Sequence, residues 1–234
     1  MNKSIFITGT GTDIGKTYIS ALIMKKMIRE NMNACYFKPV LSGAEKKDGK
    51  IYAGDIEYVK EISGLKEDAD NMGSFIYEYP ASPHLSAKLE NNPFNMEKVV
   101  QDYNKLSEKY DYILIEGAGG IFCPFTDDFE PVYTKEIIKT LNTSCILVSN
   151  TTLGAINNIM LSIYYMRDKQ IDIKGLIFNG YKDSLIEQEN IKFITKHSGI
   201  KLLAVVKYKD NNINIDLKNI FLFIRHPLWK QNQL

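Results

Sequence analysis

The sequence has few cysteines, almost no net charge and no long apolar run. Its 234 residues include three cysteines, 29 basic residues and 28 acidic residues, which give a formal net charge of +1. Three widely separated cysteines form neither a disulfide framework nor a zinc-binding pattern. A balanced charge gives no indication of a surface for nucleic acid or lipid headgroups. We therefore expect neither nucleic acid nor a membrane among the partners of this chain.

The N-terminus also lacks the features of a secretory signal peptide, because residues 1–3 lead directly into a short strand-like run. No apolar stretch reaches the roughly 20 residues that a membrane-spanning helix needs. Together these absences predict a cytoplasmic location. Cys35 and Cys145 lie within apolar runs and are expected in the core, and burial is also the expected role of Cys123.

Short apolar segments alternate along the chain with segments of helical periodicity. Several of the apolar segments are almost continuous, which is typical of strands buried on both faces of a parallel sheet. The alternation predicts an α/β fold with a doubly wound, mostly parallel sheet, helices on both faces and one domain over residues 1–234. The expected strands are 4–8, 34–37, 112–115, 145–149, 175–178 and 202–206, and the expected helices are 16–29, 96–109, 134–141, 155–167 and 186–197.

Two segments do not fit this alternation. The charged residues 45–50 are expected to form a solvated loop. The tail from about residue 210 is rich in Asn and Lys and then apolar over 220–224, and its secondary structure does not follow from the pattern. Within this tail, Trp229 is expected to be a packing anchor.

A glycine-rich motif lies between the first expected strand and the first expected helix. Residues 9–17 read Gly-Thr-Gly-Thr-Asp-Ile-Gly-Lys-Thr, in the strand–loop–helix context of a P-loop NTPase-like phosphate site. Lys16 is then expected to neutralise the β- and γ-phosphates, and Thr17 to offer its hydroxyl to Mg²⁺. The match is imperfect, because Thr10 stands where the standard P-loop has a glycine. An accidental Gly-Lys-Thr is the alternative, and a dinucleotide fingerprint fits worse because Ile14 replaces its third glycine.

Polar side chains follow other expected strands. Glu116 ends one strand and precedes Gly-Ala-Gly-Gly, so its carboxylate can hold a metal ion directly or through water. The alternative, which we favour less, is an acidic residue that merely ends the strand. Asp55 opens an expected helix, as either a second metal ligand or the helix N-cap. Lys38 is either an ammonium aimed at the ligand crevice or an exposed surface lysine, and Pro39 favours an extended backbone there. Ser42 is either a donor to substrate or part of a turn.

Five motifs, taken in order, resemble those of the dethiobiotin synthetases. Residues 8–17 are similar to that family's T-G-T-[DG]-T-x-[VI]-G-K-T loop, and residues 38–43 to its K-P-V-x-S-G. Residues 80–84, 116–120 and 153–157 resemble its P-x-S-P-H, E-G-A-G-G and L-G-x-I-N. The resemblance covers roughly residues 4–180. It depends on the ordered set, because each motif alone is only moderately specific.

The resemblance implies an ATP-dependent carbon–nitrogen ligase of biotin biosynthesis that closes a cyclic urea on 7,8-diaminononanoate with carbon dioxide. It implies Mg²⁺ as cofactor, ATP as co-substrate and a homodimer. It also implies Lys16 and Lys38 as catalytic residues and Thr17, Asp55 and Glu116 as metal ligands. The implied nucleotide site is Asp13, Ile14, Gly15, Lys16, Thr17, Tyr18, Asp55, Glu116, Gly117, Ala118, Gly119 and Asn179. The implied substrate site is Thr12, Lys38 and Ser42, with Gly154 and Asn157 supplied by the partner subunit.

The chain departs from the family pattern after the last expected strand, where residues 204–208 lack the proline of the family's adenine-contacting segment. His84 lies in a matching motif and is expected to have a structural role. A ParA- or MinD-like ATPase switch is an alternative, but Gly11 stands where those proteins have a signature lysine. A cobyrinate amidase-type ligase would need a glutaminase domain, for which the chain has no room. A third alternative is a degenerate homologue that binds nucleotide without catalysis.

Overall fold

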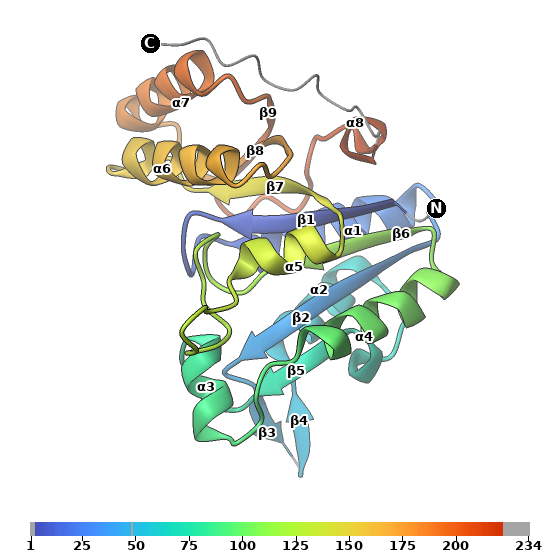
Figure 1. Ribbon diagram of the computed structural model, residues 1–234. Coiled ribbons are helices and arrows are strands. Elements are labelled where there is room, and N and C mark those ends of the chain that lie inside the picture. Colours follow the sequence, from blue (N-terminus) through green and yellow to red (C-terminus); the bar gives the residue numbers. More distant parts are fainter. Residues whose placement is uncertain (1–2, 48, 222–234) are drawn as a thin grey trace.

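The computed structural model describes residues 3–47 and 49–221, and a seven-stranded sheet forms its centre (Figure 1). Within the described residues, each pairing in this sheet is parallel. The strand order is β5-β2-β6-β1-β7-β8-β9. The strands are β1 (Lys3–Gly9), β2 (Ala34–Ser42), β5 (Gly73–Tyr77), β6 (Tyr112–Glu116), β7 (Ser144–Ser149), β8 (Ile173–Tyr181) and β9 (Leu202–Lys207).

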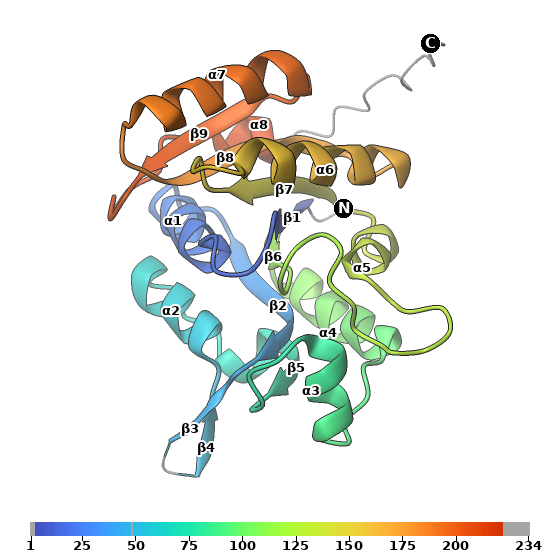
Figure 2. The same cartoon turned by 90° about the vertical axis from the view of Figure 1, so that its left-hand side faces the viewer.

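Helices cover both faces of the sheet, as the alternating pattern predicted. Figure 2 shows α1 (Lys16–Arg29) and α2 (Gly54–Ser63) on one side of the strands, and α4 (Met96–Lys109) and α5 (Thr134–Thr140) on the other. Two further helices, α6 (Ala155–Asp168) and α7 (Leu185–Ser198), pack against each other beside β7, β8 and β9. Shorter elements are α3 (Pro83–Leu89), the 3₁₀ turn η1 (Ala69–Asn71) and α8 (Leu217–Phe221).

The sequence explains the buried elements directly. The consecutive residues Ile5, Phe6 and Ile7 of β1 are all fully buried, which requires protein on both faces of the sheet. In α1, Ile19 and Ile23 are one helical turn apart and also fully buried, so this helix turns one apolar stripe to the sheet. The predicted strands and helices are therefore confirmed, with ends that differ by a few residues.

The order of connections places the ends of two strands side by side. After β1 the chain moves outward to β2 and β5, returns to β6, and then continues from β7 to β9 on the other side of β1. Ligands bind at such a switch point, beyond the carboxyl ends of the strands. The register pairs Ile7 with Glu116, so Glu116 lies beside the strand that leads into the glycine-rich loop.

The structure corrects one expectation and adds several elements that the pattern did not indicate, among them β5. Residues 45–50 are not simply a loop, because β3 (Glu45–Lys47) pairs antiparallel with β4 (Lys50–Tyr52). The edge strand β5 begins with Gly73 and Ser74, which have low strand propensity, yet it buries Phe75 and Tyr77. Tertiary packing of these two aromatic side chains outweighs the weak local preference.

The tail acquires structure by packing on α1. The Tyr18 hydroxyl donates to the Asp210 carbonyl, and Lys25 Nζ donates to the Asn211 carbonyl at 3.1 Å. The Phe221 ring meets the Tyr112 ring edge-on, with centroids 5.1 Å apart. The apolar tail residues Ile213, Ile215, Leu217, Ile220 and Phe221 are buried. Trp229 lies outside the described residues.

The remaining structural expectations concern the cysteines and the membrane. Cys35, Cys123 and Cys145 are all buried and free, as predicted. Over residues 3–47 and 49–221, no helix combines the length and apolar character needed to cross a bilayer.

Candidate active site

The glycine-rich loop adopts a conformation that only glycine tolerates at Gly15. This residue has φ of 87° and caps the N-terminus of α1. A Cβ atom at Gly15 would lie 2.0 Å from Asn179 Nδ2, which itself donates to the Ile14 carbonyl at 2.9 Å. Lys16 Nζ donates to the Gly11 carbonyl at 2.8 Å and so folds back over the loop. The loop therefore presents a helix N-terminus and an ammonium group together, which suits a bound phosphate.

A second loop packs directly against the first. The Ile121 backbone N–H donates to the Gly9 carbonyl at 3.2 Å. A Cβ atom at Gly120 would lie 3.3 Å from that same carbonyl oxygen. The glycines after Glu116 therefore permit a close backbone approach between the two loops.

An ion cluster lies where these loops leave the sheet. Lys38 Nζ lies 2.7 Å from both Asp55 Oδ2 and Glu116 Oε1. The Thr17 hydroxyl donates to Glu116 Oε1 at 2.8 Å. Lys38 is 3% exposed and Glu116 is fully buried. The structure thus excludes the alternative that Lys38 is a surface lysine.

The cluster also resolves the two interpretations of Asp55. The N-cap of α2 is Ala53, whereas Asp55 lies within the first turn of the helix. Its carboxylate lies 2.7 Å from the Lys38 ammonium. Asp55 is therefore a member of the ion cluster and not the helix cap.

A fully buried tyrosine also contacts the cluster, through the second oxygen of Glu116. The Tyr36 hydroxyl donates to Glu116 Oε2 at 2.9 Å. The sequence pattern does not single out Tyr36, because it stands in the apolar strand 34–37. The available signal was chemical, since a buried tyrosine hydroxyl needs a hydrogen-bond partner.

Burial and neighbouring charges lower the pKa of Lys16 and raise that of Lys38. Burial, followed by the repulsion of Lys38, lowers the pKa of Lys16 to about 8. Burial also opposes the charge on Lys38, but Glu116 and Asp55 outweigh it and raise the pKa of Lys38 above its ordinary value. Burial likewise acts to raise the pKa of Asp55, and Lys38 reverses this, so that the net pKa is lowered. At neutral pH, Lys38 is thus protonated and Asp55 ionised.

These side chains line one cavity of about 810 Å³. The loops after β1 and β6 form its polar side, whereas Val40, Leu41, Pro80, Ala81 and Pro83 add apolar surface. Cys123 also reaches the cavity. The cavity brings together eleven residues that the sequence singled out: Thr12, Asp13, Gly15, Lys16, Thr17, Lys38, Ser42, Asp55, Glu116, Ala118 and Gly119.

Six other candidate residues do not line the cavity. Ile14 packs toward Gly9, and the Tyr18 hydroxyl is directed to the tail. Gly117 lies against Phe6, where a Cβ atom would come within 2.8 Å of the ring. Asn179 supports the glycine-rich loop from β8, while Gly154 and Asn157 lie at the start of α6, where both are exposed.

The carboxylate oxygens of Asp55 and Glu116 contact the Lys38 ammonium, and the Thr17 hydroxyl donates to the same Glu116 oxygen. Hydroxyl and carboxylate oxygens suit Mg²⁺, which usually takes one or two carboxylates together with phosphate and water oxygens. Among the described residues, no group of three or more His, Cys, Asp or Glu side chains is arranged to hold a metal ion. The side chains present therefore fit Mg²⁺ only in company with a bound nucleotide.

Comparison of the sequence with known proteins identifies the family of the chain. Residues 3–214 match a family described as an AAA domain. An ATP-dependent dethiobiotin synthetase from Clostridium botulinum is 40% identical over 224 residues, covering 95% of this chain and 98% of the relative. Another from Clostridium perfringens is 44% identical over 222 residues, covering 92% and 97%. The chain belongs to the ATP-dependent dethiobiotin synthetase family.

This result confirms the prediction of an ATP-dependent dethiobiotin synthetase, a ligase of biotin biosynthesis. A solved MinC:MinD cell division complex from Aquifex aeolicus is similar in fold, with a TM-score of 0.54 and 15% sequence identity over 88% of this chain and 82% of that chain. At this identity the likeness concerns the fold alone. It confirms the predicted fold, a parallel sheet with helices on both faces, and gives no support to the alternative of an ATPase switch.

Proposed function

We propose that the chain closes a cyclic urea on 7,8-diaminononanoate, using carbon dioxide, ATP and Mg²⁺. The observation that carries this proposal is the shared cavity. It holds Lys16 and Thr17 of the glycine-rich loop together with Lys38 and two carboxylates. A triphosphate and a second anion can therefore be held side by side by two ammonium groups.

The rest of the cavity suits the organic substrate. Its apolar side, which includes Val40 and Leu41, matches an alkyl chain. The Ser42 hydroxyl is buried and has no hydrogen-bond partner among the described residues. Because unpaired buried hydroxyl groups are costly, we propose that Ser42 binds a polar group of the substrate. We assign Thr12 to the same substrate site because it lines the cavity.

The proposed reaction has three steps. One amine of the substrate adds to carbon dioxide, loses a proton and becomes a carbamate. A carbamate oxygen attacks the γ-phosphorus of ATP, which releases ADP and forms a carbamic–phosphoric anhydride. The second amine attacks the carbonyl carbon, and the ring closes with loss of inorganic phosphate and a proton. Phosphoryl transfer of this kind asks for positioning and charge stabilisation more than for covalent participation by the protein.

The protein supplies these effects through groups that are already in place. Lys38 is held by Asp55 and Glu116 at 2.7 Å, so its charge is fixed beside the loop before a substrate arrives. Lys16 offsets charge on the transferring phosphoryl group. We propose that Thr17, Asp55 and Glu116 hold Mg²⁺, which when bound neutralises charge on the β- and γ-phosphates. Asp13, Gly15, Ala118 and Gly119 complete the nucleotide side of the cavity, with Ile14, Tyr18, Gly117 and Asn179 behind it.

We also propose that the enzyme is a homodimer that pairs through α6. Asn157, Leu161 and Tyr164 follow each other at one-turn spacing on this helix, and Leu161 and Tyr164 are each 61% exposed. Leu153, at the start of the same surface, is 88% exposed. Exposed apolar side chains in a row are typical of a protein interface. Gly154 and Asn157 would then complete the substrate site of the partner subunit.

Two further assignments remain proposals. We assign the whole chain to one functional domain, because one sheet carries the residues of the cavity. A cytoplasmic location is proposed from the biosynthetic activity.

Phosphate release tests the proposed reaction. Release should require both 7,8-diaminononanoate and bicarbonate. The Lys38→Ala variant should still bind ATP in a calorimetric titration and should lose at least about a hundredfold in turnover, as expected for loss of a preorganised charge. Lys105→Ala is the matched control, because Lys105 is exposed on α4 and pairs only locally with Asp102. Undiminished turnover by Lys38→Ala would remove that residue from the mechanism, and stimulation by DNA or a protein instead of the diamine would favour a switch ATPase.

A further inference from the structure

Tyr36 reaches the candidate active site from inside the sheet. It stands two residues before Lys38 on β2, and residues two apart on a strand project from the same face. Both side chains contact the carboxylate of Glu116 on the neighbouring strand β6. Tyr36 is fully buried and does not line the cavity, so it can act on a ligand only through Glu116.

The two oxygens of Glu116 have different partners. Oε1 accepts hydrogen bonds from the Thr17 hydroxyl and the Lys38 ammonium, at 2.8 and 2.7 Å. Oε2 accepts from the Tyr36 hydroxyl at 2.9 Å. The tyrosine bond therefore fixes the rotation of the carboxylate and leaves Oε1 as the oxygen that faces the glycine-rich loop.

We propose that Tyr36 is a positioning residue that keeps Glu116 a single-oxygen partner of the divalent cation and thereby favours Mg²⁺ over Ca²⁺. This inference rests on the proposed Mg²⁺-dependent function of the same site. Mg²⁺ requires near-octahedral geometry with few carboxylate ligands, whereas Ca²⁺ takes more oxygens and accepts carboxylates with both oxygens. If Glu116 is free to turn both oxygens toward the loop, it can bind Ca²⁺ with both, and the affinity for Ca²⁺ increases relative to that for Mg²⁺.

The Tyr36→Phe substitution removes only the hydroxyl and keeps the ring that packs in the core. Tyr77→Phe is a matched control, because Tyr77 is also fully buried and its hydroxyl also donates at 2.9 Å, but to the carbonyl of Asn92. Both variants lose one buried hydrogen bond, and Tyr36→Phe should show the larger fall in melting temperature, because it leaves a charged carboxylate oxygen without that donor. Only Tyr36→Phe removes a hydrogen bond to Glu116 and so frees its carboxylate to rotate.

Cation binding can be measured without turnover. The wild type and both variants are titrated with Mg²⁺ and with Ca²⁺ in the presence of a non-hydrolysable ATP analogue, by displacement of Mn²⁺ observed by electron paramagnetic resonance. The ratio of the Ca²⁺ to the Mg²⁺ dissociation constant should be about tenfold smaller in Tyr36→Phe, which corresponds to ~1.4 kcal/mol. It should be unchanged in Tyr77→Phe. In steady-state assays, the KM for Mg²⁺ should rise in Tyr36→Phe while the KM for the diamine stays constant.

Three results would overturn the inference: an unchanged ratio in Tyr36→Phe, an equal change in both variants, or a wild type that binds Ca²⁺ as tightly as Mg²⁺. The comparison of Ca²⁺ and Mg²⁺ binding by the wild type needs no variant, so it can overturn the inference even where a substitution disturbs folding. A wild type that turns over fully without any divalent cation would instead refute the proposed function. The two failures are therefore distinguishable.

Discussion

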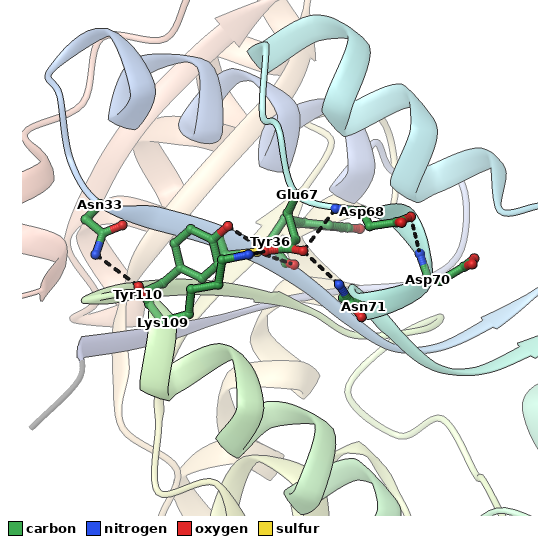
Figure 3. A network of polar contacts seen from close by, with 9 residues as sticks. Asn33, Tyr36, Glu67, Asp68, Asp70, Asn71, Lys109 and Tyr110 are labelled. Atoms are coloured by element: carbon green, nitrogen blue, oxygen red, sulfur yellow. Dashed lines mark hydrogen bonds and ion pairs between the residues drawn. The ribbon is translucent and has the colours of Figure 1, made fainter.

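A buried carboxylate that does not line the cavity connects three segments of the chain (Figure 3). Glu67 follows α2 and is 5% exposed. Its Oε2 accepts hydrogen bonds from Lys109 Nζ and the Tyr110 hydroxyl, both at 2.6 Å. Its Oε1 accepts from Asn71 Nδ2 at 2.8 Å and from the Asp68 backbone N–H at 3.0 Å. The Glu67→Gln substitution keeps the shape of this side chain and removes its charge.

The pKa gives the size of the expected effect. Burial alone raises the pKa of Glu67, but the hydrogen bonds from Lys109, Tyr110 and Asn71 outweigh it and lower the pKa from 4.5 to about 2. A depressed pKa in the folded state means that the ionised group stabilises the fold. The difference corresponds to about 3 kcal/mol of unfolding free energy, fully present above pH 4.5 and lost as the pH falls toward 2.

Urea unfolding followed by circular dichroism tests this value. The wild type should exceed Glu67→Gln by about 3 kcal/mol near pH ~7 and by only about 2 kcal/mol near pH ~3.5. Glu108→Gln serves as the control, because Glu108 is exposed on the neighbouring helix α4 and should give no difference at either pH. A gap below ~1 kcal/mol at neutral pH, or one that widens as the pH falls, would refute the reasoning.

Two further substitutions test the loop and the subunit interface. Gly15→Ala should weaken nucleotide binding at least about tenfold in calorimetry, because its Cβ would collide with Asn179 at 2.0 Å. Gly64→Ala has nearly the same left-handed φ but open space, so it should lose stability and keep its affinity. Leu161→Glu should convert the dimer to monomers in light scattering and reduce turnover, because it places a charge in the apolar contact. Leu89→Glu, on α3, should do neither; a dimeric Leu161→Glu would contradict the proposed interface.

The core of the sheet was predictable because burial on both faces leaves a direct mark in the sequence. Ile5, Phe6 and Ile7 have no polar residue between them, so only a strand covered on both sides accommodates them. The antiparallel strands 45–47 and 50–52 leave no such mark, since they consist largely of charged residues. Their pairing therefore cannot be read from a hydrophobic pattern.

The members of the active-site cluster were predictable one at a time, but their contacts were not. Glu116 and Lys38 belong to neighbouring strands, and the sequence places both near the same edge of a parallel sheet. Asp55 comes from a helix, and nothing in its local sequence distinguishes a cap from an ion-pair partner. The packing of α2 against β2 settles this point, because it brings the first turn of α2 to Lys38.

Tyr36 shows why hydrophobic patterns hide part of such a site. A pattern classifies the residue as apolar, and its ring is indeed buried in the core. Its hydroxyl nevertheless donates to a carboxylate that is also fully buried, and that carboxylate has a partner on each oxygen. Because a buried charge is tolerated only when it is paired and hydrogen-bonded, Glu116 needs a donor on its inner side as much as on its outer side. A carboxylate at the end of a buried strand therefore predicts a hidden donor behind it, and on β2 the tyrosine two residues before Lys38 supplies one.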